Sequence, residues 1–226
     1  MSRRLVLFDL DGTLVDSQRM IHACMSDAFL ARGLAPPPIE DVRRIVGLHL
    51  VEGIARLLPV PRQNDAEATA DAYRAAFRRR RDDGAVDEVL FPGVREMVMT
   101  LADRGYVLGI ATGKGLAGLD RVLETHGLAA FFPVRQSGDP PPGKPNPAMV
   151  FRALAETGIP AEAAVMIGDT SFDIEMAVSA GVRAIGVAWG YHKPTELLAA
   201  GAECIVEEAH QVVPLIDHHN RNDTNH

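Results

Sequence analysis

The chain has 226 residues, and its 47% hydrophobic content is enough to bury one core together with a modest insert. Its formal net charge of −7 argues against general nucleic-acid binding, because the phosphate backbone would be repelled. No apolar run reaches membrane-spanning length, and two cysteines do not make a disulfide framework. The N-terminus leads into a strand instead of a signal peptide. We therefore expect a cytoplasmic protein that is not bound to a membrane.

The first predicted element is a strand over residues 5–8, whose four apolar side chains suit a strand buried on both faces. Asp9 and Asp11 follow it, and Gly12 allows a sharp turn. Because side chains two positions apart on an extended chain point the same way, the two carboxylates should share one small space. Their repulsion suits one to a nucleophilic or metal-binding role and the other to proton transfer. An ordinary turn is the alternative interpretation, since Asp-Gly is a common turn dipeptide.

The next segment, residues 15–90, is rich in Ala, Arg, Leu and acids and poor in strand-like runs, so we predict that it is helical. Asp16 and Ser17 offer an N-cap for its first helix, and three prolines at 36–38 then break the chain. Further helices are expected over residues 39–46, 52–58 and 65–81. The four arginines 78–81 are interpreted as a solvated helix end, where cations complement the helix dipole.

A second apolar strand, residues 106–111, ends on Thr112 and Gly113. A hydroxyl followed by a flexible residue that can expose backbone amides could hold a phosphate oxygen there. Lys114 comes next, and it is the first lysine of the chain. It could be a second phosphate contact, but we interpret it as an exposed residue at the start of a helix.

Two later segments supply opposite charges. The proline-rich loop at residues 140–147 presents Lys144, a fixed ammonium in a chain whose default cation is arginine. A third apolar strand at residues 164–167 ends near Asp169, and Asp173 follows four residues later. Such acids could bind Mg²⁺, a hard ion that prefers oxygen ligands and often retains water.

Strands and helices alternate after residue 90, which predicts a parallel, three-layer α/β core. Helices are expected over about residues 91–101 and over residues 211–216. Of three further helices, one should end at residues 125–127, one should begin at residue 148 and one should end at residues 180–181. Strands are expected at residues 184–188 and 205–206. We therefore divide the chain into a core at residues 1–14 and 91–217, a helical insert at residues 15–90 and a disordered polar tail at residues 218–226.

In this order, the four segments resemble the motifs of the haloacid dehalogenase superfamily. The matching residues are Asp9-Leu10-Asp11-Gly12-Thr13, then Thr112, then Lys144, and finally Gly168-Asp169 with Asp173. An ordered four-part match is much more specific than any single motif. The resemblance implies a Rossmann-like three-layer parallel sheet with an inserted all-helical cap domain that closes over the active site.

The resemblance also implies a mechanism. Asp9 would attack the phosphoryl group to form an aspartyl-phosphate, and Asp11 would protonate the leaving alkoxide and then deprotonate a water molecule. Thr112, Gly113 and Lys144 would bind the phosphoryl oxygens.

For the cofactor, the resemblance implies Mg²⁺ held by Asp9, Asp169 and the Asp11 carbonyl. Asp173 would bind it through water or support the site.

The function predicted in this way is Mg²⁺-dependent hydrolysis of a small phosphorylated metabolite, similar to the phosphoglycolate phosphatase group. Asp11 favours a phosphatase over a dehalogenase, because a leaving halide needs no proton. In the cap, Arg43 and His49 are candidate specificity residues. A sugar-phosphate mutase is disfavoured because the loop after Gly47 offers His49 instead of an arginine, and it remains an alternative, as does a binding module without turnover.

Overall fold

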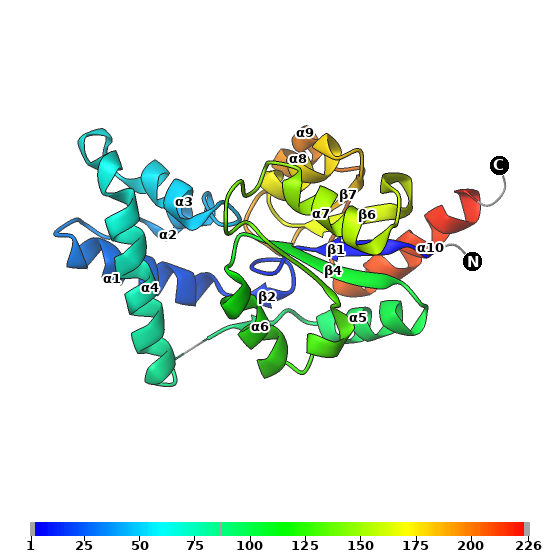
Figure 1. Ribbon diagram of the computed structural model, residues 1–226, viewed down its shortest axis with the longest axis horizontal. Helices are drawn as coiled ribbons and strands as arrows, with labels where there is room; N and C mark the ends of the chain where they lie inside the picture. The colour runs from blue at the N-terminus through cyan, green and yellow to red at the C-terminus, as the bar shows by residue number, and fades with distance from the viewer. Residues whose placement is uncertain (1–2, 86, 224–226) are drawn as a thin grey trace.

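A computed structural model of the protein describes residues 3–85 and 87–223. A lobe made of the helices α1 to α4 lies beside a larger α/β lobe, and both ends of the chain lie on the far side of the α/β lobe (Figure 1). The larger lobe is built on a six-stranded sheet in which every neighbouring pair is parallel. In spatial order its strands are β5 (Val134–Ser137), β4 (Val107–Thr112), β1 (Leu5–Phe8), β6 (Ala164–Gly168), β7 (Arg183–Val187) and β8 (Cys204–Val206). The predicted α/β class is confirmed.

The central strand β1 is buried on both faces, as its apolar sequence predicts. Leu5 and Leu7 pack into one hydrophobic cluster, and Val6 and Phe8 pack into another on the opposite face. The helices of the Leu5 face are α7 (Ala148–Thr157), α8 (Ser171–Ser179) and α9 (Pro194–Ala200). The helices of the Phe8 face are α5 (Val94–Asp103), α6 (Leu116–Thr125) and α10 (Val212–Asp223). The sheet is therefore the middle of three layers.

The helical insertion has a hydrophobic core of its own. Its helices are α1 (Gln18–Ala31), α2 (Ile39–Arg43), α3 (Leu50–Leu57) and α4 (Ala66–Asp82). Short 3₁₀ helices occur here at Val60–Asp65 and in the α/β lobe at Ala129–Phe131, Ala161–Ala163 and Ala209–Gln211. A two-stranded antiparallel ribbon of β2 (Val15–Asp16) and β3 (Val89–Leu90) ties the two ends of the insertion together.

Several local predictions are wrong. Of the two predicted capping residues, Asp16 accepts a hydrogen bond from the Gln18 backbone N–H at 3.2 Å, whereas Ser17 makes no capping hydrogen bond and its hydroxyl lies 3.2 Å from that of Tyr191. The helix predicted for residues 39–46 ends at Arg43. The tail predicted to be disordered is helical through Asp223, while residues 224–226 lie outside the described part of the chain. Among the described residues, no helix combines the length and apolar character that crossing a membrane requires.

Core packing at Phe132 gives a test of this fold. Its ring is fully buried and meets the edge of Phe8 at a centroid distance of 6.1 Å. Phe132→Ala should lower the free energy of unfolding by about 3–5 kcal/mol, because it leaves a cavity as well as losing buried apolar surface. Urea unfolding followed by circular dichroism measures this. Phe151→Ala is the matched control, since that ring is 50% exposed, and it should cost about 1 kcal/mol or less. Equal losses of unfolding free energy in the two variants would contradict the burial of Phe132 in the core.

Candidate active site

The two acids that follow β1 lie at the carboxyl edge of the sheet. Asp9 is buried, and its backbone N–H donates to the carbonyl of Ile167 at 3.0 Å, which continues the pairing of β1 with β6. Gly12 then turns the chain with φ of +95°, and a Cβ atom at this position would lie 2.2 Å from Oδ2 of Asp169. Only glycine fits there, because it tolerates positive φ and has no side chain. The turn thereby brings the first acidic segment against the last one.

Lys144 is fully buried between two carboxylates. Its Nζ lies 2.6 Å from Oδ1 of Asp9 and 2.5 Å from Oδ1 of Asp173. Burial alone would lower the pKa of Lys144, but the nearby charges of Asp173 and Asp9 outweigh it and raise the pKa above its ordinary value. The ammonium therefore stays charged beside the candidate nucleophile.

The other acids of the site are held by defined hydrogen bonds. Asp169 accepts from the Thr13 hydroxyl at 2.7 Å and from the Tyr191 backbone N–H at 2.9 Å. Oδ2 of Asp173 accepts from the Thr170 backbone N–H at 3.0 Å and from its hydroxyl at 2.7 Å, in a capping box that begins α8. Because Lys144 occupies its other oxygen, Asp173 has both oxygens engaged.

Carboxylate oxygens of Asp9, Asp169 and Asp173 lie within 4.8 Å of one another, and all three residues are buried. Burial raises the pKa of Asp9 to about 7 against the opposing effect of Lys144, and burial together with the neighbouring acids raises the pKa of Asp169. When ionised, three carboxylates facing one ammonium leave two negative charges uncompensated. Apart from the ion pair with Lys144, neither oxygen of Asp9 accepts a hydrogen bond from the described residues. This donor set fits a hard divalent cation such as Mg²⁺.

The segment after β4 faces the same space. Thr112 is buried, and its Oγ1 accepts a hydrogen bond from the Lys114 backbone N–H at 3.1 Å. A Cβ atom on Gly113 would lie 2.7 Å from the Gly47 carbonyl oxygen and 2.8 Å from that of Leu48. The glycine thus permits a loop of the helical lobe to approach the candidate phosphate site closely.

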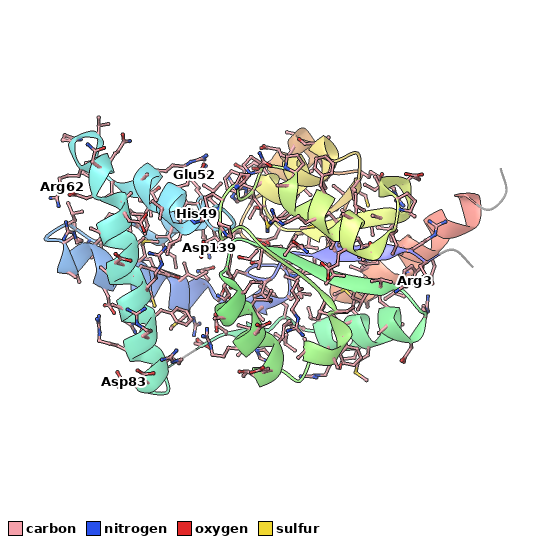
Figure 2. The ribbon with its side chains drawn as sticks, in the orientation of Figure 1. Arg3, His49, Glu52, Arg62, Asp83 and Asp139 are labelled. Carbon is pink, nitrogen blue, oxygen red and sulfur yellow. The ribbon has the colours of Figure 1, made fainter. Side chains whose placement is uncertain are left out.

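A cavity of about 450 Å³ lies between the lobes and is lined by Asp9, Asp11, Thr112 and Gly113. It is also lined by His49, which projects at the junction of the two lobes (Figure 2). Lys144, Asp169 and Asp173 are fully buried and do not line this cavity, but Lys144 contacts Asp9, which does.

Arg43 is not brought to this cavity. Its guanidinium donates to Gln18 Oε1 at 2.7 and 2.9 Å and pairs with Glu40. It lines a separate pocket together with Tyr191 and His192.

Lys114 is not the exposed helix residue that we expected. Its side chain is 12% exposed, and its Nζ lies 3.1 Å from Oδ1 of Asp11 and 2.9 Å from Oε1 of Glu88. Burial would lower the pKa of Lys114, but the charges of Asp11 and Glu88 raise it to about 12. The sequence offered one signal, since this is one of three lysines in the chain and stands two residues after Thr112.

Arg78, Arg79 and Arg81 are exposed at the end of α4, as the interpretation of arginines 78–81 as a solvated helix end predicts, but two of the four also have a place in the site. Arg78 and Arg81 line the cavity, while Arg80 pairs with Asp27 of α1 at 2.9 Å. Some arginines of this run therefore line the cavity, and another holds α4 against α1 by an ion pair.

Comparisons with known proteins agree with this geometry. A family model described as haloacid dehalogenase-like hydrolase matches residues 6–187. A relative named "Probable phosphatase IndB", from Dickeya dadantii (strain 3937), is 37% identical over 214 residues, which cover 92% of this chain and 91% of the relative. A phosphoglycolate phosphatase of Pseudomonas fluorescens (strain Pf0-1) is 29% identical over 93% of this chain and 79% of its own.

A solved structure of a haloacid dehalogenase-like hydrolase from Streptococcus pneumoniae superimposes with a TM-score of 0.81 at 26% identity, covering 94% of this chain and 98% of the other. Both the sequence and the fold place the protein in one family. The chain belongs to the haloacid dehalogenase-like hydrolases and is a phosphatase-like member with a helical cap insertion.

Proposed function

We propose that the protein hydrolyses a small organic phosphate monoester in a Mg²⁺-dependent reaction that passes through an aspartyl-phosphate on Asp9. The observation that carries the proposal is the 2.6 Å contact between Asp9 and the buried ammonium of Lys144, at the edge of a cavity that opens between the lobes. A nucleophile beside a fixed positive charge suits attack on an anionic phosphoryl group.

In the first step, a carboxylate oxygen of Asp9 forms a bond to phosphorus while the bond from phosphorus to the ester oxygen breaks. Lys144, the Thr112 hydroxyl and the Gly113 backbone N–H bind the phosphoryl oxygens as charge is redistributed. Asp11 gives its proton to the leaving alkoxide.

In the second step, ionised Asp11 takes a proton from the water that attacks the phosphorus, which releases inorganic phosphate and restores Asp9. Asp11 therefore gives up a proton in the first step and takes one back in the second.

Asp9, Asp169 and the Asp11 backbone carbonyl would hold Mg²⁺, with Asp173 acting through water or as a support for Lys144. When bound, the cation relieves the repulsion between the phosphate and the Asp9 carboxylate.

The insertion at residues 15–90 would act as the cap and residues 1–14 and 91–217 as the catalytic core, with the β2–β3 ribbon as the hinge. Closure would exclude water from the aspartyl-phosphate, and His49 would face the leaving group. Similarity to phosphoglycolate phosphatases supports a substrate of that small size. A cytoplasmic location remains a prediction from the sequence.

The role of Asp9 is tested with p-nitrophenyl phosphate and Mg²⁺. Asp9→Asn should lower kcat by at least about two orders of magnitude, since the proposed mechanism has no other nucleophile. Asp103→Asn, at the exposed end of α5, is the matched control and should retain the parent rate. Equal rates for Asp9→Asn and the parent, with both proteins folded, would remove Asp9 from its role.

The acid role of Asp11 is tested by comparing leaving groups. Asp11→Asn should slow the hydrolysis of an alkyl phosphate more than that of p-nitrophenyl phosphate, because the phenolate leaves without needing a proton. Steady-state kcat values for both esters give the comparison. The same fractional loss for both would speak against proton donation by Asp11.

The raised pKa of Asp9 predicts how metal binding depends on pH. The folded protein keeps a proton on Asp9 up to about pH 7, whereas the unfolded chain loses it near pH 3.8, so ionisation of Asp9 destabilises the metal-free fold as pH rises through this window. Mg²⁺ binding should therefore release a proton at pH 6 and much less at pH 8.5.

Calorimetric titration with Mg²⁺, in buffers of different ionisation enthalpy, measures this release. Asp9→Asn should lower the number of protons released at pH 6, and Asp169, whose pKa is also raised, accounts for any remainder. A release no larger at pH 6 than at pH 8.5 would contradict the assignment of Asp9 as a ligand.

A further inference from the structure

The cap side of the cavity carries a row of cations on one face of α4. Arg74, Phe77, Arg78 and Arg81 occur at the spacing i, i+3, i+4 and i+7, which places them along one face of a helix, and all four line the cavity. The helix runs along the cap lobe and ends next to Asp83 (Figure 2). The cavity wall that faces the catalytic acids is therefore basic, in a chain whose net charge is −7.

The core side adds two more cations at the same place. The guanidinium of Arg121 from α6 lies 4.9 Å from the centre of the Phe77 ring, and Nζ of Lys114 lies 5.6 Å from it. Both residues line the cavity. The ring thus holds cations from the core against the cap helix through cation–π attraction.

Not all of these charges are satisfied within the protein. Arg74 pairs with Asp71 at 2.8 Å, and Arg81 pairs with Asp82 at 2.7 Å. Arg78, by contrast, makes no ion pair with any residue in the described part of the chain.

Arg121 is also incompletely paired. Its Nη2 is buried and has no hydrogen-bond partner among the described residues, with Glu88 Oε2 at 3.9 Å. A buried guanidinium N–H left without an acceptor costs free energy, which an anionic ligand would recover.

Binding of the phosphoryl group does not explain the positive charge of this wall. The phosphoryl oxygens are assigned to Lys144, Thr112 and Gly113, which come from the core and not from α4. The acids that line the cavity are Asp9, Asp11 and Asp139, and Lys144 and Lys114 already pair with the first two.

Resting on the proposed function, we infer that this wall is a subsite for a second anionic group on the leaving side of the substrate, bound by Arg78 and Arg121. The ligand class is a phosphate monoester whose alcohol carries a carboxylate or a further phosphate. Guanidinium groups suit both, because their planar N–H pairs match two oxygens at once. Lys114, which already bridges Asp11 and Glu88, links occupancy of this subsite to the proton-transfer residue.

The test uses four esters that differ only in the group at the far end of a three-carbon alcohol. Propyl phosphate ends in a methyl group, 3-phosphooxypropanoate in a carboxylate, propane-1,3-diol bisphosphate in a second phosphate and 3-aminopropyl phosphate in an ammonium. At least one of the two anionic esters should have a kcat/KM about tenfold or more above that of propyl phosphate, and the ammonium ester should be the poorest. The ranking of the carboxylate and bisphosphate esters identifies which anion the subsite prefers.

Arg78→Gln and Arg121→Met should each lower kcat/KM for the preferred anionic ester about tenfold more than for propyl phosphate. Arg79→Gln is the matched control on the same helix, since Arg79 is exposed and does not line the cavity. Arg78 is exposed, so its replacement leaves the fold intact even if Arg121→Met disturbs the contact with Phe77.

Binding of the same esters to Asp9→Asn, measured by calorimetry, tests the subsite without turnover. The anionic ester should bind more tightly than propyl phosphate, and adding Arg78→Gln should remove the difference. Similar kcat/KM values for all four esters, or equal losses across them in the arginine variants, would overturn the subsite. In that case, continued turnover of p-nitrophenyl phosphate would leave the proposed function standing.

Discussion

The burial of the Lys144 ammonium between Asp9 and Asp173 is the interaction on which the rest of the site depends. A lysine charge without solvent exposure is tolerated only when it is closely paired, and removing the lysine would leave two buried carboxylates without their counter-charge. The three residues come from the end of β1, the loop after β5 and the first turn of α8. Their pairing therefore fixes the relative positions of three segments that are far apart in the sequence.

The parallel sheet makes this meeting possible. Strands β4, β1 and β6 are neighbours, so the residues that follow them share one edge without any need for long loops. The cap is tied to the same point, because the backbone of Leu48 forms a bridge with that of Lys144, and the Gly47 carbonyl lies against Gly113. A change in cap position would therefore move the residues that we propose to bind the phosphoryl group, which is the coupling that a closing lid requires.

The site residues that could be predicted from the sequence are those at the carboxyl ends of strands. Each of Asp9, Thr112 and Asp169 follows or ends an apolar run, and such a run predicts both a buried strand and the position of its carboxyl end. Because these ends meet at one edge of a parallel sheet, the sequence alone places the three residues together. β5 was not named, since Arg135 and Gln136 interrupt its apolar pattern. Lys114 was misread because its partner Glu88 lies 26 residues earlier, beside the ribbon that joins the lobes. Four consecutive arginines carry no periodicity, so only the rotation of α4 against the core decides which of them reach the cavity.

The most direct measurement is a crystal structure of the protein with Mg²⁺ and beryllium trifluoride, a stable mimic of a phosphoryl group bound to a carboxylate. We expect beryllium to be bonded to a carboxylate oxygen of Asp9, with Lys144 Nζ and Thr112 Oγ1 contacting the fluorine atoms and Mg²⁺ held by Asp9 and Asp169. An adduct on any other residue, or one that Lys144 does not touch, would contradict this expectation.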